Sequence, residues 1–366
     1  MSANADAQEN SAQRESAEET VIRLSGVWKV FGAKADDAMQ AVREEGLSKS
    51  EVLERFECVI GIADCSFEVY RGEIFCVMGL SGSGKSTMVR HLNRLIEPTA
   101  GEISVLGRDV LSLSEQELRA LRAEHIGMVF QHMALLPHKT VRDNVAFPLQ
   151  VRGEPKSRRW SVSQRCLSMV NLDGYEDRFP RELSGGMQQR VGLARALASD
   201  PEVLLMDEPF SALDPLIRRQ LQDQFMALSA ELQKTTVFIT HDLDEAIRIG
   251  HRIAIMKDGM IVQIGTPEDI VTRPADDYVR DFVEGISKLK LVFAHSIMQP
   301  MVEYQHANPS ADLTDSLRID HGCDLDHIID VSVTTDKPIV VQGDDGNDIG
   351  VIDKNTLLKG IQGGKA

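Results

Sequence analysis

A glycine-rich segment that ends in lysine and serine carries the most specific chemistry in the sequence: Gly79-Leu80-Ser81-Gly82-Ser83-Gly84-Lys85-Ser86. It follows the apolar run 74–78, which predicts a strand, and it precedes a predicted helix from Lys85. Small residues let backbone N–H groups point at phosphate oxygens, and a helix N-terminus adds a partial positive charge. We expect Lys85 to hold the outer phosphates of a nucleotide and Ser86 to ligate Mg²⁺. The alternative is a glycine-rich turn with a structural role only. The residues expected to bind the nucleotide are Gly79, Ser81, Gly82, Ser83, Gly84, Lys85, Ser86 and Thr87.

Two adjacent carboxylates, Asp207 and Glu208, follow the short apolar run Val203–Met206. Such a run is typical of a buried parallel strand, whose last residues emerge where ligands bind in an α/β sheet. Asp207 is expected to hold the Mg²⁺ shell, and Glu208 to accept a proton from an attacking water. A strand that ends in solvated acids is the alternative.

A second candidate anion site lies in the segment 183–190, Leu-Ser-Gly-Gly-Met-Gln-Gln-Arg. Ser184 is a favourable helix cap, and Gly185 and Gly186 expose backbone N–H groups at the start of the helix. A phosphate loop alone is shared by kinases, GTPases and transport ATPases. One nucleotide does not need two such sites in one chain, so this segment helps to distinguish among these three classes of protein.

The Leu-Ser-Gly-Gly-x-Gln segment before an Asp-Glu strand resembles the ATP-binding subunit of ABC transporters. In that family the signature loop of one subunit closes on the γ-phosphate held by its partner. The resemblance implies a head-to-tail homodimer with two ATP molecules, in which Ser184, Gly185 and Gly186 act across the interface.

Four further positions match the family one by one. Gln131 follows the predicted strand Ile126–Phe130 and matches the glutamine that senses Mg²⁺ and water. Asp214 lies in a loop like the one that touches the opposite subunit, and His241 matches the switch histidine that contacts the γ-phosphate. Phe31 lies where the family stacks an aromatic ring on adenine, with Trp28 as the alternative.

The resemblance is closest to the ATPases of glycine betaine, proline and choline importers. It is carried by the run 78–99, the segment 211–218 and a predicted helical hairpin within 33–58. It implies a transmembrane permease as partner, an extracytoplasmic substrate-binding protein acting indirectly, and a place at the cytoplasmic face of the inner membrane. We expect the permease to contact residues 138–144. The alternatives are a non-transport ABC-type ATPase, such as one for DNA repair or translation, and an importer ATPase for another solute. A P-loop kinase would leave 183–190 unexplained.

The elements that must position these residues follow from an alternation of predicted strands and helices. Strands over 74–78, 126–130, 203–206, 236–240 and 252–256 are separated by helical patterns, which predicts an α/β fold with a mainly parallel sheet. From residue 131 to about 180 the pattern is mostly helical and is broken by prolines, so we expect a helical lobe inserted into a P-loop ATPase core.

The chain of 366 residues is expected to have three parts: a disordered arm at 1–20, the ATPase domain at 21–285 and an α+β accessory domain at 286–366. The stretch 337–361 resembles the end of one CBS motif. Related osmosensing ATPases carry a tandem pair, which argues against ionic-strength or cyclic-nucleotide sensing by this tail. Past 285 the sequence shows few helical patterns.

The composition excludes several classes. A formal net charge of −16 argues against a nucleic-acid partner. Five scattered cysteines without Cys-x-x-Cys spacing predict neither a disulfide framework nor a zinc site. We expect no secretory leader and no membrane span, since no run of 18 apolar residues occurs.

Overall fold

The computed structural model describes residues 19–131, 134–211, 213–284, 289, 291–309, 313–343 and 345–362. The chain divides into two compact units, Met1–Ile264 and Gly265–Ala366. The second unit thus begins before the domain boundary predicted at 285/286, and residues 285–288 lie outside the described residues. The predicted disordered arm also falls outside them, apart from Glu19 and Thr20.

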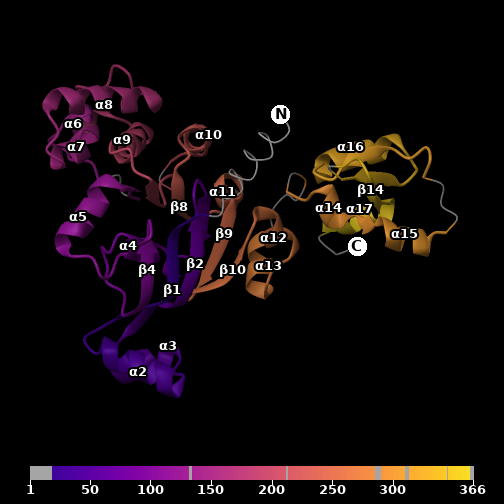
Figure 1. Ribbon diagram of the computed structural model, residues 1–366, viewed down its shortest axis with the longest axis horizontal. Coiled ribbons are helices and arrows are strands. Elements are labelled where there is room, and N and C mark those ends of the chain that lie inside the picture. Colours follow the sequence, from indigo (N-terminus) through magenta and orange to yellow (C-terminus); the bar gives the residue numbers. More distant parts are fainter. Residues whose placement is uncertain are drawn as a thin grey trace, which may run out of the picture. The chain divides into compact units, whose positions relative to one another are not determined.

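The secondary structure of the first unit follows the predicted alternation closely (Figure 1). Its strands are β1 (Thr20–Phe31), β2 (Val59–Tyr70), β3 (Ile74–Met78), β4 (Ala100–Val105), β5 (Arg108–Asp109), β6 (Ile126–Val129), β7 (Val203–Asp207), β8 (Thr235–Thr240), β9 (Arg252–Lys257) and β10 (Met260–Gly265). Its helices are α2 (Ala35–Glu45), α3 (Lys49–Phe56), α4 (Lys85–Leu92), α5 (Glu115–Glu124), α6 (Val141–Val145), α7 (Phe147–Val151), α8 (Lys156–Met169), α9 (Gly185–Leu197), α10 (Pro215–Leu232) and α11 (Leu243–Ile249), with a 3₁₀ turn η1 (Pro180–Glu182).

The sheet that positions the predicted site has the order β10-β9-β3-β8-β7-β6. β3 pairs parallel with β8 and β9, and β7 pairs parallel with β6 and β8. Every residue of β3, β7 and β8 is buried, as expected for parallel strands covered on both faces. The predicted parallel sheet is confirmed, and its strands bring residues distant in sequence to one edge.

A separate sheet, of order β2-β1-β4-β5, was not predicted from the sequence. β1 pairs antiparallel with β2 and β4. The predicted helical hairpin is present as α2 and α3, and it packs with the ends of β1 and β2 around a cluster that includes Met39, Val52 and Cys58. The hairpin therefore connects the end of β1, at Phe31, to the start of β2, the strand that pairs with β1.

The predicted helical lobe is present as α6, α7 and α8, which gather beside α9 at one end of the first unit (Figure 1). Thr140 caps α6 by accepting a hydrogen bond from the Asp143 N–H at 3.2 Å. Ser114 and Glu117 form a capping box at the start of α5. Local capping signals thus set where these helices begin.

The second unit contains more helix than the sequence predicted. Its elements are α12 (Pro267–Thr272), α13 (Asp277–Val283), α14 (Ala294–Ile297), β11 (Gln299–Pro300), α15 (Met301–Ala307), β12 (Arg318–Asp320), α16 (Leu325–Thr334), β13 (Ile339–Gln342), β14 (Asp348–Ile352) and α17 (Lys354–Gln362). Its sheet has the order β11-β14-β13-β12, and its core includes Ile297, Leu325, Ile328, Val341 and Ile352. β13, β14 and α17 occupy the stretch whose sequence resembles the end of one CBS motif. The expectation of few helices past 285 was wrong.

Candidate functional site

The glycine-rich loop joins the end of β3 to the start of α4, as the sequence predicts. Gly79, Gly82 and Gly84 have φ angles of 153°, 82° and 103°, a region that favours glycine. A Cβ atom on Gly84 would lie 2.6 Å from the Gly61 carbonyl oxygen, and one on Gly79 would lie 2.2 Å from the Met256 carbonyl oxygen. The loop can therefore pass this close to neighbouring backbone only without side chains at these positions.

The Lys85 ammonium lies inside this loop. It donates hydrogen bonds to the Gly79 carbonyl at 2.7 Å and to the Leu80 carbonyl at 3.0 Å. Burial lowers the pKa of Lys85, while the nearby carboxylates of Glu208 and Asp207 act in the opposite direction. A cation enclosed by backbone and facing two carboxylates is well placed for binding phosphate oxygens.

The Ser86 hydroxyl donates to Asp207 Oδ1 at 2.8 Å, so the residues predicted to bind Mg²⁺ from α4 and β7 meet. Asp207 is buried, and its other oxygen lies 3.6 Å from Arg90 Nη2. A hydroxyl and a carboxylate are the hard oxygen donors that Mg²⁺ prefers. The pair therefore fits a magnesium site beside the phosphate loop.

Glu208 lies at the centre of the predicted catalytic group. Its Oε2 accepts a hydrogen bond from Gln131 Nε2 at 3.2 Å and lies 3.1 Å from His241 Nδ1. These side chains follow β7, β6 and β8, so the carboxyl ends of three neighbouring parallel strands bring them together.

The backbone of Glu208 is unusual, because its φ angle is 46° although it is not a glycine. Its N–H donates to the Ile239 carbonyl of β8 at 3.1 Å, which holds this conformation. Non-glycine residues in the left-handed region cost free energy and concentrate at functional sites. The turn directs the carboxylate toward Gln131 and His241, and the sequence gives no sign of it.

A cavity of about 550 Å³ joins these groups. Its lining is Gly61, Leu80, Ser81, Gly82, Gly84, Lys85, Ser86, Thr87, Gln131, Glu208 and His241. The sequence reasoning missed Gly61 and Leu80. A glycine inside a strand signals a close backbone approach, which could have pointed to Gly61. Ser83 is buried and its hydroxyl has no hydrogen-bond partner within the described part of the chain.

Phe31 adjoins this lining through Gly61. A Cβ atom on Gly61 would lie 2.6 Å from Phe31 Cε2, so the ring lies directly over that glycine. The ring is 39% exposed, and the Lys29 ammonium lies 5.1 Å from its centroid. Trp28 packs instead with the α2–α3 hairpin. The structure thus favours Phe31 over Trp28 as the aromatic ring available to a nucleotide base.

The signature residues do not line the cavity of their own chain. Ser184 is exposed and caps α9 by accepting from the Met187 N–H at 3.4 Å. Asp214 is exposed and caps α10 by accepting from the Ile217 N–H at 3.1 Å. A Cβ atom on Gly186 would lie 2.7 Å from Ile217 Cγ2, so the starts of α9 and α10 pack together. The two segments therefore form one exposed surface.

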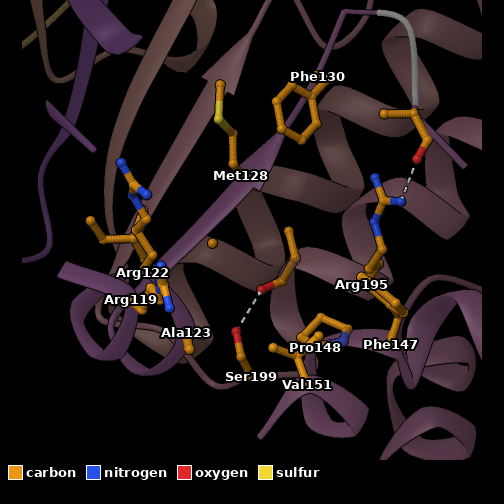
Figure 2. A pocket seen from close by; sticks show the side chains of 14 residues that line it. Arg119, Arg122, Ala123, Met128, Phe130, Phe147, Pro148, Val151, Arg195 and Ser199 are labelled. Carbon is orange, nitrogen blue, oxygen red and sulfur yellow. Dashed lines mark hydrogen bonds between the residues drawn. The ribbon is translucent and has the colours of Figure 1, made fainter. Parts of the chain in front are cut away.

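A second pocket, of about 440 Å³, lies among α5, β6, α7 and α9 (Figure 2). Phe130, Phe147, Pro148 and Val151 contribute apolar surface to it. The Arg195 guanidinium also lines the pocket and donates a hydrogen bond to the Ala134 carbonyl at 2.7 Å. A dashed line from Arg195 marks this bond in Figure 2. Ala134, which also lines the pocket, follows Gln131 by three residues in the sequence.

Part of the predicted permease contact at 138–144 has a structural role. Asn144 is buried, accepts from the Leu136 N–H at 2.7 Å and donates to the carbonyls of Leu136, Lys139 and Thr140. Its side-chain amide therefore holds this loop. Within the described residues, no helix is long and apolar enough to cross a membrane.

Comparison with known proteins places the chain among transport ATPases. Residues 62–211 match the family model described as ABC transporter. The glycine betaine transport ATP-binding protein OpuAA of Bacillus subtilis is 51% identical over 76% of this chain and 66% of that protein. The trimethylamine N-oxide transport system ATP-binding protein TmoW of Pelagibacter ubique is 42% identical over 92% of this chain and 96% of that protein. The glycine betaine/proline betaine transport system ATP-binding protein ProV of Escherichia coli is 51% identical over 75% of this chain and 69% of that protein.

Solved structures agree on the fold. The dimeric post-hydrolysis structure of the ATP-binding cassette MJ0796, bound to ADP and Pi, is 31% identical, with a TM-score of 0.57. The match covers 67% of this chain and 98% of that chain. A second dimeric structure of the same cassette matches with the same TM-score and 32% identity. The predicted P-loop ATPase core with an inserted helical lobe is therefore confirmed.

Proposed function

Because the chain belongs to the ABC transporter family, we propose that it is the ATP-hydrolysing subunit of an importer for glycine betaine, choline, proline or a related quaternary amine or osmolyte. The observation that carries this proposal is the identity of 42% to TmoW, which extends over 92% of this chain and 96% of the relative. Two further relatives at 51% identity are named for glycine betaine transport. The peripheral position at the cytoplasmic face of the inner membrane belongs to the same proposal.

The geometry of the cavity supports ATP hydrolysis by positioning and charge stabilisation. Lys85 and the loop amides would hold the phosphates, and Ser86, Asp207 and Gln131 would hold Mg²⁺, which would neutralise charge on the phosphate oxygens. Glu208 accepts the proton of the attacking water, while Gln131 and His241 orient the carboxylate and the transferring group. Phe31 stacks on the base.

The exposed surface of Ser184, Gly185, Gly186 and Asp214 supports a homodimer that encloses two ATP molecules. The Ser184 hydroxyl and the backbone N–H groups of Gly185 and Gly186 can donate hydrogen bonds to an anion, yet these residues lie outside the cavity of their own chain. A second copy in a two-fold arrangement supplies them to the phosphate loop, as the dimeric state of the MJ0796 cassette suggests. The second unit, with the order β12, α16, β13, β14 and α17, is proposed to be an accessory CBS-like domain.

We place the permease contact at the second pocket and the adjoining segment 138–144. The pocket is largely apolar and is bordered by Arg119, Arg122 and Arg195 (Figure 2). Its lining also includes Ala134 and residues of β6, the strand that Gln131 follows. A permease segment seated there would touch the elements that carry Gln131. The extracytoplasmic binding protein acts only through the permease.

The charge-insertion variant Val151→Asp tests this contact. Val151 is 65% exposed and lines the pocket, so an aspartate there would have to be desolvated by a docked apolar segment. Capture of the permease from detergent-solubilised membranes by the tagged chain is expected to fall at least about tenfold. Leu53→Asp, at an exposed leucine of α3, is the matched control and should capture the permease normally. Equal capture by both variants would contradict this placement.

Uptake measurements test the function as a whole. In a strain lacking this gene, the wild-type chain is expected to restore uptake of at least one of glycine betaine, choline, proline and trimethylamine N-oxide. Lys85→Ala should not restore it, because the ammonium inside the loop is lost, whereas the exposed Lys359→Ala should. Restored ATP hydrolysis without uptake of any of these solutes would favour an importer for another solute. Uptake that does not depend on the gene would favour a non-transport ATPase.

A further inference from the structure

Arg218, on the first turns of α10, bridges two loops of the site that are distant in sequence. Its Nη2 donates to the Leu213 carbonyl at 3.2 Å, and its Nη1 lies 3.2 Å from Asp242 Oδ2. Leu213 directly precedes Asp214, and Asp242 directly follows His241. One guanidinium thus contacts both the segment expected to meet a second copy and the segment that carries the switch histidine.

Each end of this bridge is fixed further. Asp242 Oδ1 accepts from the Glu245 N–H at 3.2 Å, and the Asp242 N–H donates to Thr240 Oγ1 at 3.0 Å. The position of Asp242 therefore determines where the backbone of the preceding residue, His241, lies. On the other side, Asp214 caps α10 itself. Arg218 consequently connects the start of α10 to the start of α11.

The packing of α10 against α11 does not depend on this bridge. Deeper between the helices, Gln222 Nε2 donates to Glu245 Oε1 at 2.9 Å, and both side chains are buried. Arg218 is 28% exposed and Asp242 is 34% exposed, so the ion pair lies at the border of the core. Loss of Arg218 would leave the helices packed and release only the two loops at their ends.

We propose that Arg218 is a positioning residue that ties Leu213–Asp214 to His241. Contact of a second copy with Asp214 is thereby linked to the position of the imidazole beside Glu208. The inference rests on the proposed function, because it requires that a homodimer hydrolyses ATP. A planar guanidinium suits this task, since its two Nη groups donate in fixed, different directions.

The test compares Arg218→Gln with Arg219→Gln, a neighbouring exposed arginine of the same helix, in the full-length chain. For Arg218→Gln, kcat of ATP hydrolysis is expected to fall about 10- to 100-fold, because small misplacements of catalytic groups are costly. Its KM for ATP and its melting temperature should match those of Arg219→Gln. An unchanged kcat would overturn the inference. So would a loss of kcat that is accompanied by equal losses of ATP binding and thermal stability.

A double-mutant cycle with Asp242→Asn separates positioning from general damage. Asparagine can still cap α11, so this variant removes chiefly the charge that faces Arg218. If both residues act through one bridge, the double variant should be within about twofold of the slower single variant. Multiplied losses would overturn the inference. If the wild-type chain hydrolyses ATP and the Arg218→Gln variant does so at the same rate, only this inference is overturned. If the wild-type chain has no ATPase activity, the proposed function is overturned and this inference falls with it.

Discussion

Replacement of Glu208 by glutamine is expected to slow ATP hydrolysis by about 100- to 10,000-fold, the range that a general base contributes. Glutamine keeps the size of the side chain and can still contact Gln131 and His241, but it cannot accept the proton of the attacking water. The phosphate loop and Lys85 are untouched, so ATP binding should persist. In the proposed homodimer, hydrolysis removes the γ-phosphate shared by the two copies, so the variant should accumulate as a dimer under MgATP, which size-exclusion chromatography would detect.

Glu202→Gln is the matched control, because Glu202 and Glu208 flank the same strand, β7. Glu202 lies at the other end, 2.8 Å from His125 Nδ1 and 3.6 Å from Arg71 Nη1. The control should hydrolyse ATP at nearly the parental rate. If Glu208→Gln hydrolyses ATP at the parental rate, Glu208 is not the general base. If the variant stays a monomer under MgATP, the proposed homodimer around two ATP molecules is contradicted.

Most of the first unit was predictable because its signals are local. Ser114 with Glu117 marks the start of α5, and the apolar run of β3 before the glycine-rich loop marks a buried strand. The separate antiparallel sheet was not predictable, since only pairing between distant segments distinguishes β1, β2 and β4 from further strands of the parallel sheet. Hydrophobic pattern determines that a strand exists more readily than which sheet it joins.

The second unit shows where local pattern misleads. α16 is rich in β-branched residues, with Ile328, Ile329, Val331 and Val333, which favour strands by propensity. It is nevertheless a helix, because Asp324 caps it and Leu325 and Ile328 place one buried face on the core of the unit. Tertiary packing overrides propensity here, and the pattern alone could not show it.

Some features of the candidate site were predictable from the sequence and others were not. Glu208, Gln131 and His241 were predictable as neighbours, since the carboxyl ends of parallel strands meet at one edge of a sheet. The left-handed backbone of Glu208 and the contact of Gly61 with Phe31 depend on packing between distant segments. The bridge made by Arg218 depends on such packing too, and no motif in the sequence marks these features.

Ser184→Arg is expected to abolish ATP hydrolysis by the dimer while the monomer binds ATP nearly normally. Ser184 is exposed and lies outside the cavity of its own chain, so a bulky side chain there obstructs only the one ATP site that it completes on a second copy. The lost helix cap alone costs about 0.5–2 kcal/mol. Ser114→Arg is the matched control, because Ser114 is an exposed cap of α5 that accepts from the Glu117 N–H at the same distance, 3.4 Å. The control should lose similar stability and keep its ATPase activity.

Mixing two inactive variants distinguishes a shared site from a site within one chain. In a Ser184→Arg or Lys85→Ala homodimer, both sites of the proposed arrangement carry a lesion. A mixed dimer places both lesions in one site and leaves the other intact, because each site takes its phosphate loop from one copy and Ser184 from the other. An equal mixture is therefore expected to recover about a quarter of the wild-type rate, since half of the dimers are mixed and each has one intact site of two. If each chain held a complete site, every site in the mixture would carry a lesion and no activity would return.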